Sequence, residues 1–314
     1  DVHWQEMAAL PDHAPAPPEN PFSEAKAELG KKLFNDPKLS RSGQIACASC
    51  HEADMAFADG RRVSFGHDRQ SGRRNASSLV MSGYSTHLFW DGRGGSLEQQ
   101  ALHPIVDPVE MAFDIPSLLE RLNADATYRQ QFAQVFGPGP ITPELTGQAL
   151  ATFQRTLVKA TRNTAFEQLL RGRPQRMIYE QLYGLHLYRT KARCMNCHFG
   201  PALSDEQFHN VGLSYYGRKY EDLGRYEVTR QPQDVGAFRT PSLRLVMKTA
   251  PWMHNGLFLN MEGTLAFYNM GMPRPRPTAQ QANDPLFPST SERLKALNLD
   301  KDELRALRSF LDTL

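Results

Sequence analysis

The four cysteines of the chain all lie in two copies of one pattern, in which two cysteines are separated by two residues and followed directly by a histidine. The copies are Cys47-Ala-Ser-Cys50-His51 and Cys194-Met-Asn-Cys197-His198. In this spacing each thiol can form a thioether with one vinyl group of a haem, while the adjacent imidazole ligates the iron through Nε2. A thioredoxin-like redox pair needs no histidine at this place, and a zinc site would need four ligands per ion. The pattern therefore predicts two covalently attached c-type haems, with His51 and His198 as iron ligands.

The opposite face of each haem decides what it does. A second strong ligand favours electron transfer, whereas an open and polar face lets peroxide or oxygen reach the iron. The chain offers eight further histidines and 11 methionines as second ligands. Composition alone does not choose among them.

Composition limits the kind of protein that holds these motifs. A chain of 314 residues suits about two domains, and its 40% of hydrophobic residues suffices for their cores. The mean hydropathy is −0.52, and no apolar run approaches the length of a spanning helix, so we expect no membrane insertion. The net charge of +2, from 36 basic and 34 acidic residues, gives no reason to expect a nucleic-acid partner.

The beginning of the chain bears on its location. It starts at Asp1 rather than Met and has no basic segment followed by an apolar stretch, so we expect that a signal peptide has been removed. Because haem is attached covalently outside the cytoplasm, we expect the protein in the bacterial periplasm.

Residues 1–20 hold four prolines and few large apolar side chains, which predicts an extended Pro-rich tail. We expect the tail histidines, His3 and His13, to face water. After Ser23, an expected N-cap, the apolar spacing predicts a helix that leads toward the first motif.

A matching segment precedes the second motif. The phrase Leu29-Gly-Lys-Lys-Leu-Phe34 corresponds to Tyr183-Gly-Leu-His-Leu-Tyr188, and apolar residues from Met177 to Tyr188 have helical spacing. An Ala-x-x-Asp phrase follows each motif, at 56–59 and 202–205. Duplication of one haem-binding unit accounts for this repeat. We expect a mainly α fold of two cytochrome c-like haem domains related by internal duplication, with long irregular connections.

The expected N-terminal haem domain covers 21–165, the C-terminal haem domain covers 166–290, and 291–314 hold a helix that docks back on the body. Thr142 caps one predicted helix, which has proline at its first position. The pair Asp300 and Glu303 is the capping-box pattern of the last helix. Alternating prolines from 273 to 277 exclude a helix and open a loop that runs to about residue 288.

Seven phrases, taken together and in order, resemble those of the bacterial di-haem cytochrome c peroxidases and the MauG group within them. They are Leu29-Gly-Lys-Lys-Leu-Phe34, Leu39-Ser-Arg-Ser-Gly43, the first haem motif, Phe89-Trp-Asp-Gly-Arg93, Asp107-Pro-Val-Glu-Met111, Thr240-Pro-Ser-Leu-Arg244 and Ala250-Pro-Trp-Met-His-Asn-Gly256. The resemblance spans residues 21–270. It implies one calcium ion and two haems in adjoining domains, with peroxide reacting at one haem while the other relays oxidising equivalents.

Tyr268 separates the branches of this family. Conventional peroxidases have a methionine ligand at this distance from the residue matching His254, whereas MauG-like proteins have a tyrosine ligand within Phe-Tyr-Asn, as here. A phenolate is a hard anionic donor that stabilises ferric and higher-valent iron. The resemblance therefore implies Tyr268 as the second ligand of the C-terminal haem. The alternative is that Tyr268 is an ordinary helix residue and that Met270 or Met272 is the ligand.

The resemblance also implies roles around the N-terminal, peroxidatic haem. Glu110 matches an acid over the open haem face, where one carboxylate can take a proton from peroxide and return it to the leaving oxygen. The simplest alternative role of Glu110 is that of a helix-capping or surface acid. Gln100 and Pro104 match positions near the same pocket. Trp90 matches a tryptophan between the haems, and core packing is its simplest alternative role.

His67 complicates the assignment. It lies sixteen residues after His51, where many conventional peroxidases have a removable histidine ligand of the peroxidatic haem and where MauG has a glycine. The chain is thus MauG-like at Tyr268 and peroxidase-like at His67. We hypothesise that His67 lies on a mobile loop and either caps the iron at rest or faces solvent.

Asn75, Thr249 and Pro251 match the family's calcium ligands, an amide oxygen and backbone carbonyls, and such hard oxygen donors suit calcium. By themselves such residues are usually turn or capping groups. His209 and His254 also lie in family phrases, and we expect them in a haem pocket or between domains without assigned chemistry.

Three functions follow. The leading hypothesis is a MauG-like oxidase that uses hydrogen peroxide to form a high-valent di-haem state and oxidises an aromatic residue, Trp above all, on a partner protein. The alternative is a conventional peroxidase that reduces peroxide to water with electrons from a small cytochrome or cupredoxin. A non-enzymatic electron carrier is disfavoured, because Glu110 would then have no purpose.

Overall fold

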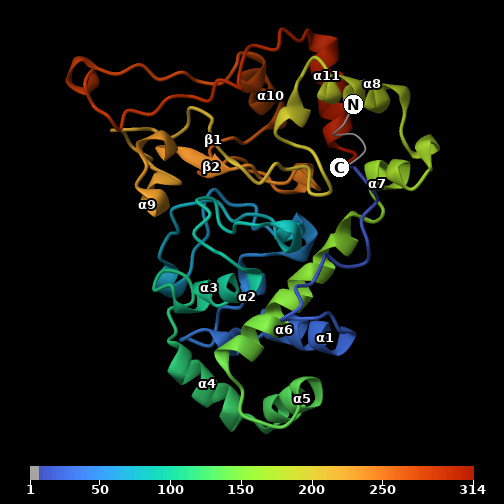
Figure 1. The fold of residues 1–314 in the computed structure, drawn as a ribbon, viewed down its shortest axis with the longest axis vertical. Coiled ribbons are helices and arrows are strands. Elements are labelled where there is room, and N and C mark those ends of the chain that lie inside the picture. Colours follow the sequence, from blue (N-terminus) through green and yellow to red (C-terminus); the bar gives the residue numbers. More distant parts are fainter. Residues whose placement is uncertain (1–6) are drawn as a thin grey trace. The chain divides into compact units, whose positions relative to one another are not determined.

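Two units make up the chain (Figure 1). The computed structural model describes residues 7–314, so His3 and the first part of the expected tail lie outside the described residues. The N-terminal unit comprises Pro11–Leu88 and Gly94–Ala160. Of the described residues, the C-terminal unit comprises 7–10, Phe89–Arg93 and Thr161–Leu314. Both units are therefore assembled from separate stretches of sequence, whereas the expected domains 21–165 and 166–290 are continuous.

The N-terminal unit is helical. Its helices are α1 (Glu24–Asn35), α2 (Leu97–Gln100), α3 (His103–Val106), α4 (Ile115–Ala124), α5 (Ala126–Phe136) and α6 (Pro143–Arg155). The Ser23 side chain accepts the Lys26 amide at the start of α1, and Thr142 caps α6, as their sequences predict. α1 lies beside α6 (Figure 1), and their apolar faces form the core together with residues of α4 and α5.

The C-terminal unit pairs two helices in a similar way. Its elements are α7 (Ala165–Leu170), α8 (Tyr179–Arg189), β1 (Phe208–Asn210), α9 (Tyr226–Thr229), β2 (Ala237–Arg239), α10 (Met261–Asn269) and α11 (Lys301–Leu311). α8 lies beside α11 (Figure 1), and α11 begins with the predicted capping box of Asp300 and Glu303. The two strands pair antiparallel, with His209 opposite Phe238. The prediction of a mainly α fold is confirmed.

Irregular segments connect these elements. The stretch from Pro273 to Pro288 is a loop with one 3-10 turn at Ala279–Gln281, as its prolines predict. In the part of the chain that the structure describes, no helix has both the length and the apolar character needed to cross a membrane.

The two helix pairs share one packing detail. A Cβ atom built on Gly30 of α1 would lie 1.9 Å from the carbonyl oxygen of Ala149 on α6. A Cβ atom on Gly184 of α8 would lie 2.0 Å from the carbonyl oxygen of Ala306 on α11. Glycine therefore lets the backbones of each pair touch. An aromatic contact is also repeated. The ring centroids of Phe34 on α1 and Phe153 on α6 are 5.1 Å apart, and so are those of Tyr188 on α8 and Phe310 on α11.

Residues 7–20 have no helix or strand, and they are packed rather than free. Met7, Leu10 and Ala14 are buried. His13 does not simply face water, because its ring stacks on Phe22 with 3.9 Å between the ring centroids. The proline content predicts an extended tail, but the apolar side chains of this segment are buried against the rest of the protein.

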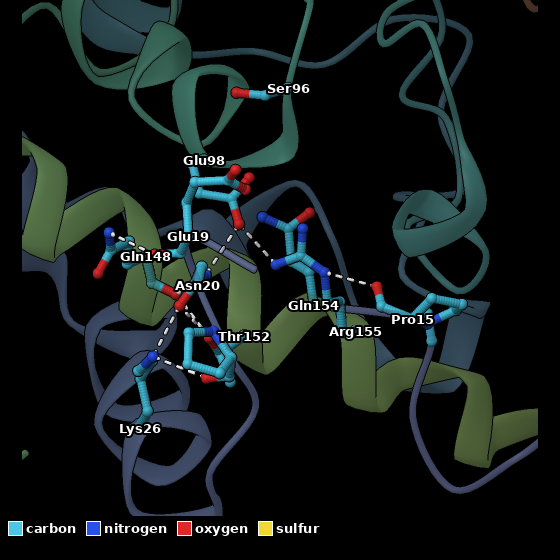
Figure 2. A network of polar contacts seen from close by, with 12 residues as sticks. Pro15, Glu19, Asn20, Lys26, Ser96, Glu98, Gln148, Thr152, Gln154 and Arg155 are labelled. Atoms are coloured by element: carbon cyan, nitrogen blue, oxygen red, sulfur yellow. Dashed lines mark hydrogen bonds and ion pairs between the residues drawn. The ribbon is translucent and has the colours of Figure 1, made fainter. Parts of the chain in front are cut away.

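A buried polar network fixes the end of this segment to α2 and α6 (Figure 2). Arg155 of α6 forms an ion pair with Glu98 of α2 at 2.7 Å, and its Nε donates to the Pro15 carbonyl oxygen. Asn20 donates to the same Glu98 carboxylate at 2.8 Å and accepts from Lys26 Nζ at 2.7 Å. Glu98 thus holds α2, which ends at Gln100, against α6.

The segment Phe89–Arg93 is built into the C-terminal unit. The Arg239 amide donates to the Trp90 carbonyl oxygen at 2.8 Å, and Arg225 Nη1 donates to the carbonyl oxygens of Asp91 and Gly92, both at 2.9 Å. Gly92 has φ +71°, and a Cβ atom there would lie 2.3 Å from the Phe208 ring. Glycine is required at this position for both reasons.

A buried ion pair joins further parts of the C-terminal unit. Arg244 Nη1 lies 3.1 Å from Glu167 Oε2, and both side chains are fully buried. Arg244 Nε also donates to the Pro201 carbonyl oxygen, and Glu167 Oε1 accepts the Leu10 amide. The pair therefore connects α7, the loop after the second motif and the N-terminal segment.

Candidate active site

The first motif forms a 3-10 turn, Cys47–Ser49. The amides of Cys50 and His51 both donate to the Cys47 carbonyl oxygen, at 3.2 and 3.1 Å. His51 Nδ1 lies 2.8 Å from the carbonyl oxygen of Phe57, which has φ +58°. Because a carbonyl only accepts, Nδ1 carries the proton and Nε2 keeps a lone pair that can ligate a metal. Burial lowers the pKa of His51, which favours this neutral form.

The second motif repeats this geometry. It forms the 3-10 turn Cys194–Asn196. The amides of Cys197 and His198 both donate to the Cys194 carbonyl oxygen, at 3.2 and 2.8 Å. His198 Nδ1 lies 3.0 Å from the carbonyl oxygen of Leu203, which has φ +50°. Burial again lowers the pKa of the histidine. One difference is that Tyr188 of α8 donates its hydroxyl to the His198 carbonyl oxygen at 2.5 Å.

The four cysteines fit covalent haem attachment better than a disulfide or a zinc site. All four are free thiols, and burial raises the pKa of Cys47 and of Cys194 to about 12. A structural zinc site needs four ligands per ion, whereas each motif supplies two thiols and one histidine. Each pair instead stands next to a neutral histidine with an available Nε2, which is the donor set that a c-type haem needs.

Glu110 lies near the first motif. Burial is the main cause that raises the pKa of Cys47 and of Cys50, and the negative charge of Glu110 raises both further. The Glu110 side chain is exposed. Its backbone neighbour Met111 donates to the carbonyl oxygen of Pro104 on α3 at 3.1 Å. The structure therefore brings Glu110, Pro104 and the first motif into one region of the N-terminal unit.

His67 is attached to the same turn. Its amide donates to the Glu110 carbonyl oxygen at 2.7 Å, and Gln70 Nε2 donates to the Pro108 carbonyl oxygen at 3.2 Å. The His67 side chain is 17% exposed, and its Nε2 lies 3.4 Å from Asp68. The loop is therefore fixed to the Glu110 turn at two points. The role of His67 as a resting ligand stays a prediction.

Tyr268 lies near the second motif, on α10. Burial, followed by the charges of Cys194 and Cys197, raises the pKa of Tyr268 above its ordinary value. Of the two methionines that were its alternatives, Met270 is 69% exposed and Met272 is 6% exposed. Tyr268 is thus near the cysteines of the second motif, while Met270 faces solvent.

Trp90 belongs to the C-terminal unit, where it lies next to His254. The ring centroids are 6.4 Å apart in an edge-on arrangement. The buried His254 ring also stacks on Phe238, with 3.6 Å between the ring centroids. These three rings form a continuous aromatic cluster, which gives Trp90 a packing role inside this unit.

The expected calcium ligands divide between the units. Asn75 is a buried residue of the N-terminal unit, and its Nδ2 donates to the Arg61 carbonyl oxygen at 2.8 Å. In the C-terminal unit, Thr249 donates its hydroxyl to the Val246 carbonyl oxygen at 2.9 Å and Pro251 is buried. Calcium binding by these residues stays a prediction, as does the expected role of the half-buried Gln100.

One polar pair beside the second motif was not foreseen from the sequence. His209 Nε2 lies 2.8 Å from Asp205 Oδ2, and this hydrogen bond is the first cause that raises the pKa of His209 to about 9. Ligand atoms of these two residues and of Cys197 lie within 4.8 Å of one another. The repeated Ala-x-x-Asp phrase could have indicated that Asp205 forms a polar contact after the second motif. Asp59, which ends the same phrase after the first motif, accepts a hydrogen bond from Ser64.

Comparisons with known proteins agree with this arrangement. Residues 24–175 match the family described as di-haem cytochrome c peroxidase. The chain is 38% identical over 271 residues to the methylamine utilization protein MauG of Methylophilus methylotrophus, covering 84% of this chain and 78% of that protein. It is 33% identical over 336 residues to the cytochrome-c peroxidase IdrP1 of Pseudomonas sp. (strain SCT), covering 98% and 85%.

A solved structure is similar along almost the whole chain. It is described as a MauG-like protein associated with microbial copper homeostasis, and it matches with a TM-score of 0.85 and 31% identity, covering 99% of this chain and 95% of that one. Because the sequence matches and the fold agree over most of the chain, this protein belongs to the di-haem cytochrome c peroxidase family of peroxide-dependent oxidoreductases.

Proposed function

We propose that the protein is a MauG-like oxidase, which uses hydrogen peroxide to oxidise an aromatic side chain, Trp above all, on a partner protein. The observation that supports this proposal is the inequality of the two motifs. A carboxylate, Glu110, lies near enough to the cysteines of the first motif for its charge to raise their pKa, whereas a half-buried phenol, Tyr268, lies near the cysteines of the second.

The motifs would hold two c-type haems, through Cys47 and Cys50 in one unit and Cys194 and Cys197 in the other. His51 and His198 would each ligate iron through Nε2, because Nδ1 is engaged by a backbone carbonyl. When bound, the haems would supply the redox chemistry, since they can give two electrons to peroxide and recover them one at a time from a substrate.

Glu110 would manage the protons of this reaction. Its carboxylate accepts a proton from one oxygen of hydrogen peroxide and donates it to the other, which then leaves as water. Glu110 suits this task because its side chain is exposed to an incoming molecule and lies near the first motif.

Tyr268 would be the second iron ligand in the C-terminal unit. It must give up its Oη proton to ligate, and burial opposes this loss unless a positive charge is nearby. A ferric iron provides that charge, and the resulting phenolate favours the oxidised metal. A site of this kind retains an oxidising equivalent until a substrate supplies an electron.

Peroxide reduction consumes two electrons and two protons per molecule and yields two molecules of water, so a donor is required. In the MauG-like reaction the donor is the aromatic side chain of the partner. A second candidate is a conventional peroxidase that takes both electrons from a small cytochrome or cupredoxin. The position of His67 beside Glu110 and the peroxidase relatives favour this alternative.

The identity of the second ligand tests the proposal. We expect the ferric protein to lack a methionine-to-iron charge-transfer band and Tyr268→Phe to alter the spectrum of one haem while both haems stay attached. Tyr226→Phe, elsewhere in the C-terminal unit, is the matched control and should leave the spectrum unchanged. A methionine band in the wild type, or an unaltered Tyr268→Phe spectrum, would contradict the MauG-like assignment.

The substrate is tested by mass spectrometry. Proteins encoded beside the gene would be incubated with the holoprotein and peroxide, and we expect oxidised tryptophan in one of them only when both are present. Turnover with a reduced small cytochrome or cupredoxin and no protein oxidation would favour the conventional peroxidase. We also propose the periplasm as its location, which fractionation of the source bacterium would check.

A further inference from the structure

α8 has an outer face that is apolar and aromatic. Ile178 is 62% exposed, Tyr179 82%, and Leu182 and Tyr183 are each 37% exposed. Their spacing of four places them on one side of the helix, opposite the buried residues that pack toward α11. Three large apolar side chains of the helix and Ile178 at its N-cap are exposed together, which indicates an interaction surface.

The rings on this outer face are ordered. Tyr179 and Tyr183 stack with centroids 6.5 Å apart and planes at 9°, and Tyr183 and the exposed His186 stack at 6.4 Å and 14°. Rings that are already arranged lose little conformational freedom when a partner covers them, so the surface is prepared for docking.

Basic residues precede and follow the outer face in the sequence. Residues 171–193 contain six arginines and lysines and a single acidic residue, Glu180, while the rest of the chain holds 30 basic and 33 acidic residues. The basic residues are Arg171, Arg173, Arg176, Arg189, Lys191 and Arg193. Arg171 and Lys191 are ion-paired with Glu167 and Glu303, so the positive charge that flanks the apolar face is carried by exposed arginines, Arg173 and Arg176 before it and Arg193 after it. A partner that fits it carries carboxylates around an apolar patch.

The outer face is close to the second motif. The motif begins at Cys194, five residues after the end of α8, and Tyr188 on the inner side of the helix donates its hydroxyl to the His198 carbonyl oxygen. A protein docked on the outer face would be separated from Tyr188 by roughly 10 Å, the thickness of one helix.

We propose that the outer face of α8 docks an acidic protein that exchanges electrons with the second haem site. This inference rests on the proposed function, because it supplies the partner from which electrons are drawn. A second copy of the chain fits less well, since a two-fold contact would bring two basic segments together. Tyrosine and arginine are also the residues that dominate protein interfaces, which favours a protein over a lipid surface.

The test uses the holoprotein and a small acidic c-type cytochrome as the probe. We expect salt-sensitive binding that weakens at least about tenfold in Tyr179→Ser/Tyr183→Ser and in Arg173→Glu/Arg176→Glu. The matched controls are Tyr220→Ser and Arg218→Glu, on an exposed loop of the same unit, and they should bind within about twofold of the wild type. Haem content shows that each variant folds.

Activity separates this inference from the proposed function. With a small-molecule reductant, peroxide turnover should be equal in wild type and in all four variants. If the wild type does not turn over peroxide, the proposed function is refuted, whatever the binding data show. Failure of the wild type to bind the acidic cytochrome, or undiminished binding by both docking variants, would refute the docking surface. Self-association, or binding to anionic vesicles, that requires Tyr179 and Tyr183 would also overturn it.

Discussion

His51 and His198 obtain the same orientation from an unusual backbone. The carbonyl groups that accept their Nδ1 protons belong to Phe57 and Leu203, bulky residues in the left-handed region at φ +58° and +50°. This conformation costs about 1–2 kcal/mol per residue. Both motifs thus accept local strain to fix a histidine ring, which is typical of positions where geometry serves function.

Glu110→Gln tests the proton transfer. The amide retains the size of the side chain but cannot accept a proton, so we expect the reaction with hydrogen peroxide to slow by about 10²–10⁴-fold. Stopped-flow absorbance would measure the rate, and haem content should be unchanged. Glu120→Gln, on the exposed side of α4, is the control. Equal rates in Glu110→Gln and wild type would exclude Glu110 from the reaction.

At the residue scale, prediction from the sequence is possible where the signal is local. The donor set of each motif follows from the spacing of five residues, and the pairing of Asp205 with His209 was within reach because the two are four residues apart. The ion pair of Arg244 and Glu167 was not, since 77 residues separate its members and only the fold brings them together. No local pattern marks such a pair.

At the scale of elements, the two helix pairs repeat a glycine contact and an aromatic contact. Gly30 touches α6 and Gly184 touches α11 at the same place in each pair, and the aromatic residue four positions later, Phe34 or Tyr188, also corresponds. We propose that this agreement reflects duplication of one haem-binding unit. Convergence would not require the same glycine four residues before the same aromatic contact.

Gly30→Ala and Gly184→Ala test the close approach. Each new methyl would meet a carbonyl oxygen of the partner helix, so the helices must separate, and we expect the free energy of unfolding to fall by about 1–3 kcal/mol. Gly95→Ala is the control, because the nearest atom to its Cβ would be 3.9 Å away. Urea unfolding measures the effect. Equal stability of all three variants would mean that the contacts are not as tight as described.

Glu98→Gln tests the network that holds α2. Burial alone would raise the pKa of Glu98, but hydrogen bonds from Arg155 and Asn20 lower it below the ordinary 4.5. The contribution of Glu98 to stability is therefore present above about pH 4.5 and is lost as the pH falls through the lowered pKa. The variant leaves Arg155 buried without its charged partner, which costs about 3 kcal/mol near neutral pH.

Urea unfolding at several pH values would check this prediction. The difference between wild type and Glu98→Gln should be largest near neutrality and should shrink in acid. Glu28→Gln on α1 is the control. A difference that is independent of pH would assign the effect to shape rather than to charge.

Caps and prolines made the elements predictable. Ser23, Thr142 and Asp300 each begin the helix that their sequence signals, because a cap is decided within four residues. The apolar residues of α8 predicted a helix but not its orientation, since Leu182 is exposed although Leu185 is buried. A helix that is apolar on both sides does not reveal from sequence which side packs inward.

For the whole molecule, calcium is the testable ligand. If Asn75, Thr249 and Pro251 bind calcium, the melting temperature should rise with calcium concentration and fall on chelation, because an ion that binds only the folded state stabilises it. Magnesium, which prefers a tighter octahedral site, is the control. Asn75→Ala should remove the dependence on calcium. If the melting temperature of the wild type does not change with calcium concentration, the calcium site is excluded.

The segment Phe89–Arg93 has a consequence for synthesis. Its partners in the C-terminal unit, Arg225 and Arg239, leave the ribosome more than 130 residues later. These five residues must therefore wait for their partners in the C-terminal unit while the sequence on both sides of them folds as the N-terminal unit. A gene divided at any single point also leaves one unit without a piece of its own backbone. The C-terminal unit can be produced apart from the N-terminal unit, with all its described parts, only if this segment and residues 7–10 are supplied separately.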